Sequence, residues 1–248
     1  MSAVRQFNNP DDANFNADGK LRIALAGNPN CGKTTVFNGY TGARQHVGNY
    51  PGVTVDRKEG HITVGGKQVT VVDLPGTYSL TAYSMEELVA RRELAAGNVQ
   101  AVIDVVDSSA LERNMLLTVQ MLEMGIPVVL GCNMMDEARA AGIHIDMERL
   151  SELLGIPVLP MVARSGEGLD EAMAVAIKLA QAGKANALRI SYGSDIDPVL
   201  LDMEKRIEGS GLLTKKYMPH WIALKILEGD SEIMSEVRAA NAALAEEL

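Results

Sequence analysis

Short apolar runs alternate with amphipathic stretches along residues 20–182 of the chain. The apolar runs are rich in Val, Ile and Leu, which is typical of strands buried on both faces. In the amphipathic stretches, apolar residues recur at helical spacing. Strands are predicted at residues 20–26, 53–64, 67–72, 99–106, 126–132 and 158–162, and helices at 33–40, 84–95, 111–124, 147–154 and 169–182.

This alternation predicts a parallel sheet with helices on both faces. The Gly65-Gly66 pair indicates one early hairpin, so the sheet is expected to be mixed. Residues 41–52 contain three Gly and one Pro and are predicted to form a mobile loop, and 74–82 a second loop. Ser84, with Glu87 three residues later, predicts a capping box.

The pattern changes after Gly183, where no further strand is predicted. Helices are expected at 197–208, 215–227 and 231–247. The predicted organisation is a flexible extension at 1–19, an α/β domain at 20–183 and a small all-helical domain at 184–248. The helical pattern still runs at Leu248, which suggests a fragment of a longer protein; simple fraying of the chain end is the alternative.

Composition narrows the class of protein. The longest apolar stretches fall short of the roughly 18–20 residues that a membrane span needs, and the polar first 20 residues contain no signal peptide. The net charge of −9 disfavours broad nucleic-acid binding. The two cysteines have no metal-type spacing, which favours free thiols in a reducing cytosol.

The strongest chemical signal lies between the first predicted strand and helix. Its eight residues match the P-loop pattern of two glycines, with four residues between them, followed by Lys and Ser/Thr. Glycine lets the backbone approach phosphate oxygens, and the N–H groups at the helix start receive the anion. Lys33 is predicted to contact the β- and γ-phosphates, and Thr34 to bind Mg²⁺. The loop consists of Gly27, Asn28, Pro29, Asn30, Cys31, Gly32, Lys33 and Thr34, and Thr35 is added as a further nucleotide contact.

Two downstream motifs extend this interpretation. Asp73 and Gly76, at the end of a strand, are suited to holding Mg²⁺ and meeting the γ-phosphate. Asn133, Met134 and Asp136 follow the strand at 126–132. The Asp136 carboxylate can accept the two hydrogen bonds that guanine offers and adenine does not. Helix capping is the alternative role for Asn133 and Asp136.

These motifs, in this order, resemble those of the Ras-like P-loop GTPase superfamily over residues 20–182. Several segments further resemble the FeoB family of bacterial ferrous iron transporters. These segments are the P-loop, residues 53–56, residues 73–80, Met134 where most GTPases have Lys, and the helical segment that follows. In that family the helical segment favours bound GDP and links the GTPase domain to an iron permease in the membrane.

The resemblance implies further roles. Thr54 would close onto Mg²⁺ and the γ-phosphate, and Asn30 would bind an activating K⁺, unless it only stabilises the turn. Val162, Ala163 and Arg164 would form the guanine-facing loop, although Val162 departs from the usual Ser/Thr. The implied catalytic residues are Asn30, Lys33, Thr54 and Gly76, the implied metal ligands are Thr34, Thr54 and Asp73 for Mg²⁺ and Asn30 for K⁺, and the implied ligands are GTP and GDP.

Thr77 follows Gly76, where Ras-type enzymes place a water-orienting Gln. Slow intrinsic hydrolysis is therefore expected, with the water held by backbone groups. The four histidines are scattered and do not predict a metal site. Glu232 and Glu236 lie one helical turn apart and could hold Fe²⁺, but a solvated helix face is the simpler interpretation.

The sequence thus predicts the GTP-hydrolysing regulatory domain of a ferrous iron transporter, at the cytoplasmic face of the bacterial inner membrane. Its expected partners are guanine nucleotide, the permease of the same full-length chain and a homo-oligomer, with no nucleic acid. A soluble GTPase of ribosome or RNA maturation is the alternative, which the acidic balance and Met134 disfavour. A nucleotide sensor with negligible turnover is the third hypothesis.

Overall fold

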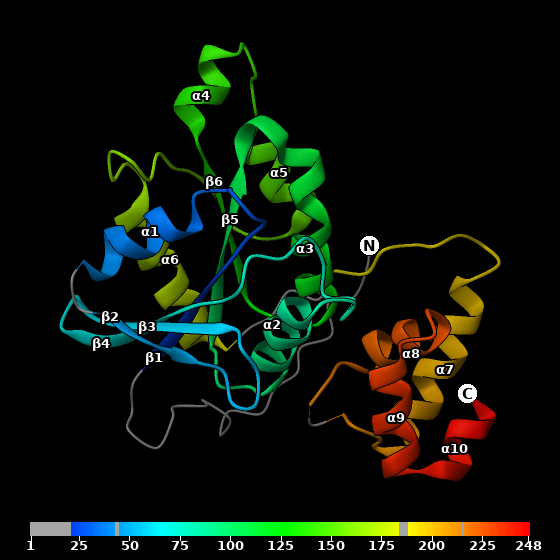
Figure 1. The fold of residues 1–248 in the computed structure, drawn as a ribbon. Coiled ribbons are helices and arrows are strands. Elements are labelled where there is room, and N and C mark those ends of the chain that lie inside the picture. Colours follow the sequence, from blue (N-terminus) through cyan, green and yellow to red (C-terminus); the bar gives the residue numbers. More distant parts are fainter. Residues whose placement is uncertain (1–20, 43–44, 184–187, 215) are drawn as a thin grey trace.

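The structure, a computed structural model, describes residues 21–42, 45–183, 188–214 and 216–248. The predicted amino-terminal extension at 1–19 lies outside the described residues. Within them, an α/β domain built on one sheet is followed by a group of helices (Figure 1). The predicted fold class is confirmed: a mixed, mostly parallel sheet flanked by helices, with a helical segment after it. The domain boundary at residue 183 stays a prediction.

The central sheet has seven strands in the order β2-β3-β4-β1-β5-β6-β7. Neighbouring strands pair in parallel from β4 through β1, β5 and β6 to β7. At the other edge, β3 runs antiparallel to both of its neighbours, β2 and β4. Gly65 and Gly66 join β3 to β4 with φ angles of 55° and 78°, as the predicted hairpin requires. The strands are β1 (Leu21–Ala26), β2 (Gln45–Asn49), β3 (Asp56–Val64), β4 (Lys67–Asp73), β5 (Ala101–Asp107), β6 (Val128–Asn133) and β7 (Val158–Pro160).

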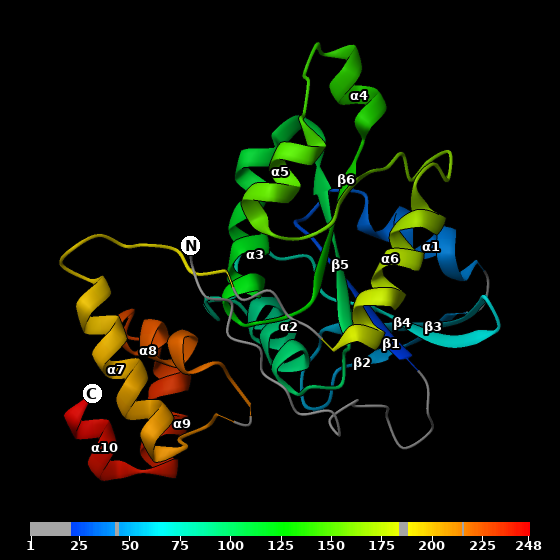
Figure 2. The same ribbon diagram turned by 180° about the vertical axis from the view of Figure 1, so that it is seen from behind.

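Helices cover both faces of the sheet (Figures 1 and 2). On one face, α1 (Lys33–Thr41) and α6 (Leu169–Ala182) bury an aliphatic cluster. On the other, α2 (Met85–Ala95) and α3 (Leu111–Glu123) bury a second cluster, and α5 (Met147–Leu154) packs beside β7. The parallel strands end at a common edge, so the loops that follow them gather there.

The prediction of a loop over 41–52 is wrong for residues 45–49, which form β2. This strand pairs with β3 from Gln45↔Gly60 to Asn49↔Asp56. Its residues are mostly exposed and show no apolar alternation, so the backbone ladder stabilises it rather than side-chain burial. The predicted strand at 53–64 begins only at Asp56, because the Tyr50 N–H donates to the Val55 carbonyl at 2.9 Å and closes a turn.

Two short elements next to the strand ends escaped prediction. A 3-10 turn, η1 (Ser108–Ala110), follows β5, and α4 (Met135–Ala140) follows β6. The predicted capping box is confirmed: the Glu87 N–H donates to Ser84 Oγ at 3.1 Å, and the Glu87 carboxylate accepts from the Ser84 N–H.

In the described residues, the carboxy-terminal segment consists of helices and the turns that connect them, with no strand, as predicted. It contains α7 (Asp197–Ser210), α8 (Pro219–Leu227), α9 (Ser231–Ala240) and α10 (Ala242–Glu247). The predicted single helix over 231–247 is wrong, because Asn241 leaves helical geometry and its side chain caps α10. The helix predicted over 215–227 begins later, at Pro219, where proline suits the first helical position.

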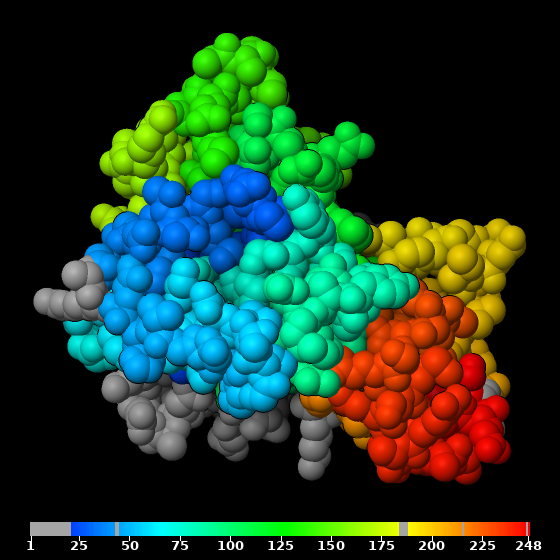
Figure 3. All heavy atoms as spheres, in the orientation of Figure 1, coloured from blue at the N-terminus to red at the C-terminus, as the bar shows by residue number. Residues whose placement is uncertain are grey.

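The helical segment lies against the α2 side of the α/β domain (Figures 1 and 2), and Figure 3 shows the surfaces of α2 and α8–α9 meeting. Trp221 is fully buried inside it and stacks on Tyr217, with ring centroids 4.8 Å apart. Across the described ranges, every helix is too short or too polar to cross a membrane.

Candidate functional site

The loop between β1 and α1 presents open backbone N–H groups. No side chain caps the first turn of α1, so its N–H groups are available to an anion. A Cβ on Gly27 would lie 2.4 Å from the Val105 carbonyl oxygen, and one on Gly32 would lie 2.3 Å from Asn133 Nδ2. Gly27 and Gly32 also have φ angles of 150° and 86°. Both positions therefore require glycine, as a P-loop does.

Two asparagines of this loop have opposite environments. Asn28 is buried, and its Nδ2 donates to the Arg113 carbonyl oxygen at 3.4 Å. Asn30 is exposed, in left-handed geometry with a φ of 67°. Its side chain makes no hydrogen bond to any other described residue, so no side-chain bond supports the turn-stabilising alternative. The Asn30 amide oxygen is open to a cation.

Lys33 and Asp73 form a direct, buried ion pair. Lys33 begins α1 and Asp73 ends β4, and β4 lies beside β1 with Leu25 opposite Asp73. Their side chains are 9% and 7% exposed, and Lys33 Nζ donates to Asp73 Oδ1. Thr34 and Thr35 follow on the same turn and are exposed. Lys33, Thr34 and Asp73, predicted to hold phosphate and Mg²⁺, thus lie close together at the sheet edge.

Asn133 joins the P-loop to the loop that follows β7. Its Nδ2 donates to the Cys31 carbonyl oxygen, and its Oδ1 accepts from the Ala163 N–H, each at 2.9 Å. The helix-capping alternative fails for Asn133, because Met134 occupies the N-cap of α4 and no side chain caps that helix. The side chain instead fixes the spacing of two loops that a nucleotide would bridge.

Asp136 lies in the first turn of α4, where its side chain bonds to the neighbouring loop. Arg164 Nη2 donates to Asp136 Oδ2 at 2.7 Å. Met134 reaches towards the P-loop, with its Cε 3.5 Å from the place of a Gly32 Cβ. Val162 accepts from the Ser165 and Gly166 N–H groups, which tightens this loop. The structure therefore brings the predicted guanine-facing residues together.

The segment after β4 runs along the P-loop. A Cβ on Gly76 would lie 3.5 Å from Pro29 Cα, and the Thr77 N–H donates to the Gly27 carbonyl at 3.4 Å. Thr54 is placed differently: it lies exposed on the turn that joins β2 to β3. Its predicted closure onto Mg²⁺ stays a prediction that requires movement of this turn.

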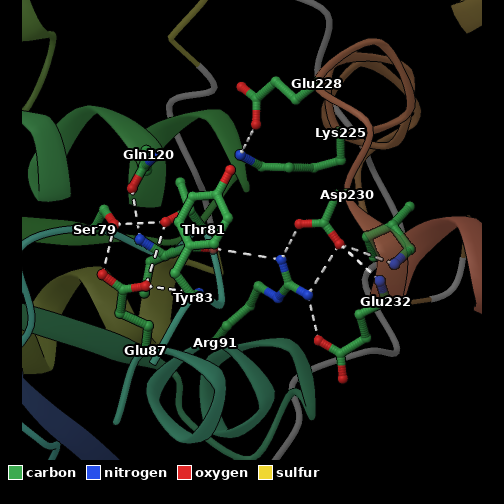
Figure 4. A network of polar contacts seen from close by, with 12 residues as sticks. Ser79, Thr81, Tyr83, Glu87, Arg91, Gln120, Lys225, Glu228, Asp230 and Glu232 are labelled. Carbon is green, nitrogen blue, oxygen red and sulfur yellow. Dashed lines mark hydrogen bonds and ion pairs between the residues drawn. The ribbon is translucent and has the colours of Figure 1, made fainter. Parts of the chain in front are cut away.

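Sequence reasoning missed the network that leads from this segment to the helical domain (Figure 4). Arg91 of α2 is 1% exposed and donates to the Leu80 carbonyl at 3.4 Å. The same guanidinium donates to Asp230 Oδ2 at 2.5 Å and bonds to Glu232. Gln120 Oε1 accepts from the Leu80 N–H at 2.7 Å. The only advance signal was an arginine on a predicted helix, which is too common to be informative.

The remaining candidates are the two glutamates Glu232 and Glu236, possible metal ligands and the thiol of Cys31. Glu232 pairs with arginines and Glu236 with Lys216, so the solvated-face interpretation of these glutamates is modified to ion pairing. The described residues contain no group of three or more His, Cys, Asp or Glu arranged to hold a metal. Cys31 is buried, and this burial raises the pKa of its thiol to about 12, which agrees with a packing role.

Comparisons with known proteins agree on one family. The family model described as ferrous iron transport protein B matches residues 21–176, and the model of the FeoB cytosolic helical domain matches 192–248. The Fe(2+) transporter FeoB of Salmonella typhimurium is 44% identical over 228 residues, which are 90% of this chain and 29% of the relative. An Fe(2+) transport protein A/FeoB fusion protein of Porphyromonas gingivalis is 45% identical over 86% of this chain and 26% of its own length. The chain thus spans less than a third of these relatives.

Solved structures give the same result. The cytosolic domain of the T. maritima FeoB iron transporter in its GMPPNP form matches with a TM-score of 0.84 and 38% identity, over 89% of this chain and 86% of that one. Its GDP form I matches with a TM-score of 0.83. The cytosolic domain of L. pneumophila FeoB matches with a TM-score of 0.81 and 37% identity, over 91% of this chain and 88% of that one.

Proposed function

The chain belongs to the FeoB family of ferrous iron transport proteins, and we propose that it binds and hydrolyses GTP as the regulatory domain of such a transporter. The fold is that of the family's amino-terminal GTPase domain. One observation carries the proposal: Asn133 ties the P-loop to the loop of Ala163, which supports a single site for the groups proposed to bind phosphate and base.

The P-loop suits a nucleotide because its glycines leave the backbone open to phosphate oxygens. Its glycines sit where a side chain would collide with Val105 or Asn133, and the N–H groups of α1 are uncapped. Lys33 would contact the phosphates from within this loop. At the other end of the site, Asp136 would accept the two guanine donors, so an adenine base would leave a carboxylate oxygen unpaired.

Oxygen donors suited to Mg²⁺ lie beside Lys33. Asp73 offers a carboxylate and Thr34 an exposed hydroxyl on the next residue along α1. Thr54 would add a third oxygen after its turn moves. Bound Mg²⁺ supplies charge neutralisation at the β- and γ-phosphates. The protein's own role would be to position these oxygens and to let Lys33 separate from Asp73.

Asn30 is the proposed K⁺ ligand. Its side chain is exposed and makes no hydrogen bond to the described residues, and its backbone is left-handed with a φ of 67°. A monovalent cation there supplies positive charge at the transferring phosphoryl group. Because Thr77 replaces the expected Gln and is buried, we expect slow intrinsic turnover, with the water oriented by backbone groups near Gly76.

Arg91 provides the route by which the nucleotide state would reach the helical domain. It contacts the Leu80 carbonyl in the segment that follows Gly76 and binds Asp230 across the domain interface. Rearrangement of that segment would alter both contacts. In the full-length protein, at the cytoplasmic face of the inner membrane, the movement would pass on to the iron permease. A homo-oligomer stays a proposal.

The family assignment opposes the alternative of a soluble ribosomal or RNA-maturation GTPase. A nucleotide sensor with negligible turnover is separated from an enzyme only by a hydrolysis assay. Guanine recognition is tested by calorimetry with GDP and ADP. We expect GDP to bind in preference to ADP, and Asp136→Ala to abolish the preference. Equal binding of the two nucleotides by the parent protein would refute guanine recognition.

A further inference from the structure

We propose that Arg164 is an intramolecular competitor for the guanine-binding carboxylate: its guanidinium pairs with Asp136 Oδ2, one of the two oxygens that guanine would use, and so weakens the hydrogen bond that this oxygen offers to the base. This inference rests on the proposed guanine site and deepens it. It assigns Arg164 control of nucleotide affinity through Asp136, rather than a favourable contact with the nucleotide.

The geometry of the pair supports competition. Arg164 Nη2 lies 2.7 Å from Asp136 Oδ2, within the distance of a charge-assisted hydrogen bond. The Arg164 side chain is 78% exposed and that of Asp136 is 36% exposed. The guanidinium is therefore more open to solvent than the carboxylate that it contacts, and it occupies one of the acceptor positions of Oδ2.

The backbone around Arg164 is held in place. The preceding Ala163 N–H donates to Asn133 Oδ1 at 2.9 Å. On either side, the Val162 N–H donates to the Glu167 carbonyl at 3.0 Å, and the Ser165 N–H donates to the Val162 carbonyl at 3.0 Å. Because these bonds hold the loop backbone, rotation of the long Arg164 side chain can break the pair without moving the loop. Release is then a fast side-chain movement that leaves the site intact.

The hydrogen-bond donors of each base predict which nucleotides lose affinity to the competition. Guanine offers an N1–H and an exocyclic amine, and so requires both carboxylate oxygens. Hypoxanthine offers only the N1–H and requires one oxygen, which leaves Oδ2 to Arg164. An exposed ion pair is worth up to about 1 kcal/mol, which corresponds to roughly fivefold in affinity. Removing Arg164 should therefore strengthen GDP binding by about two- to fivefold and IDP binding by less.

Calorimetric titration of the 248-residue protein with GDP and IDP tests the proposal, using Arg164→Ala, Arg164→Lys and the parent. Arg206→Ala is the matched control, since Arg206 forms an exposed pair with Asp202 on α7. We expect tighter GDP binding by R164A, an intermediate value for R164K and no change for R206A. Raising the salt to about 0.5 M should narrow the gap between parent and R164A, because exposed pairs are screened.

A second arm removes the carboxylate. Asp136→Asn presents an amide that complements xanthine, which has a carbonyl where guanine has its amine. With XDP as the ligand of D136N, adding R164A should change nothing, because the competing ion pair no longer exists. The same gain in both backgrounds would overturn the proposal.

The remaining outcomes are equally distinct. Weaker GDP binding by R164A would mean that Arg164 contacts the nucleotide, and unchanged binding would mean that the pair has no effect; either overturns the competitor role while leaving guanine binding intact. Absence of GDP binding by the parent would overturn the proposed function as well.

Discussion

Lys33 and Asp73, the predicted phosphate-binding cation and the predicted Mg²⁺ ligand, are bonded directly to each other. Both side chains are more than nine-tenths buried, so the pair is poorly screened by solvent. Each group therefore satisfies the other's charge. Under the proposed function, nucleotide and Mg²⁺ would together replace this pair, which would couple their binding.

Asp73→Asn should separate the two roles of Asp73. Without Mg²⁺, in excess EDTA, the variant should bind GDP about tenfold more tightly, because Lys33 is freed from a charged hydrogen bond worth about 1.5–3 kcal/mol. With Mg²⁺, it should lose the parent's Mg²⁺ dependence, since its carboxylate ligand is gone. Titration with fluorescent mant-GDP under both conditions measures this. Asp202→Asn, at an exposed pair, is the control. Weaker binding under both conditions would show that the ion pair does not oppose nucleotide binding.

Thr77→Ala tests whether the residue after Gly76 orients the catalytic water. Thr77 is 4% exposed, and its backbone N–H bonds to Gly27, so the account assigns it a structural position. GTP turnover by the variant should stay within about threefold of the parent, with Thr77→Ser as the conservative control. A loss of about a hundredfold, the scale of a positioned catalytic group, would make Thr77 itself catalytic.

Asp104 should give the protein a pH-dependent stability. It is fully buried on β5, one oxygen accepts from Thr118 at 2.6 Å, and burial raises the pKa of its carboxyl from 3.8 to about 7. A raised folded-state pKa means that the native protein binds this proton more tightly than the unfolded chain does. Stability from this group is therefore full below about pH 4 and is lost as the pH rises towards 7, at about 1.4 kcal/mol per pH unit.

Urea unfolding of the parent and Asp104→Asn between pH 5 and 8 measures this effect. The free energy of unfolding of D104N, relative to the parent, should rise from pH 5 to 7 and level off above it. Parallel pH profiles for the two proteins would contradict the assignment. The exposed variant D202N should follow the parent.

Arg91→Met should weaken the joint between the two domains. The change leaves Asp230, 5% exposed, without its cation, which typically costs 3–5 kcal/mol. Asp230→Asn in the same chain should restore part of the loss, because asparagine can still cap α9. Urea unfolding is the measurement. Arg92→Met is the matched control: Arg92 binds the same Glu232 but is 60% exposed, so less than about 1 kcal/mol is expected. Equal losses for R91M and R92M would refute the role of the buried bridge.

The sequence carried most of the fold because apolar runs and turn residues act locally. Gly65-Gly66, the capping box at Ser84 and the strand before Gly27 all follow from neighbouring residues. The strand β2 did not, since it depends on a ladder to β3 and has no apolar face of its own. The break at Asn241 has a local signal, because asparagine favours the N-cap position, and its side chain caps α10.

The site also combines features that depend on neighbouring residues with features that depend on long-range contacts. The position of the P-loop residues and of Asn133 at neighbouring strand ends could be predicted, because the spacing of these motifs reflects backbone geometry there; their roles in nucleotide binding stay predictions. Their partners could not be predicted: Asn133 meets Ala163 from 30 positions away, and Arg91 meets Asp230 from 139 positions away. The pairing of Asp136 with Arg164 likewise arises only when two loops fold side by side.

The most direct test of the account is GTP hydrolysis by this protein in K⁺ and in Na⁺, with Mg²⁺ present, for the parent and Asn30→Ala. We expect the parent to hydrolyse GTP slowly in Na⁺ and clearly faster in K⁺. N30A should keep the Na⁺ rate and lose the stimulation by K⁺. Absence of hydrolysis in either salt would contradict the enzyme, and hydrolysis with equal rates in both salts would contradict the cation role of Asn30.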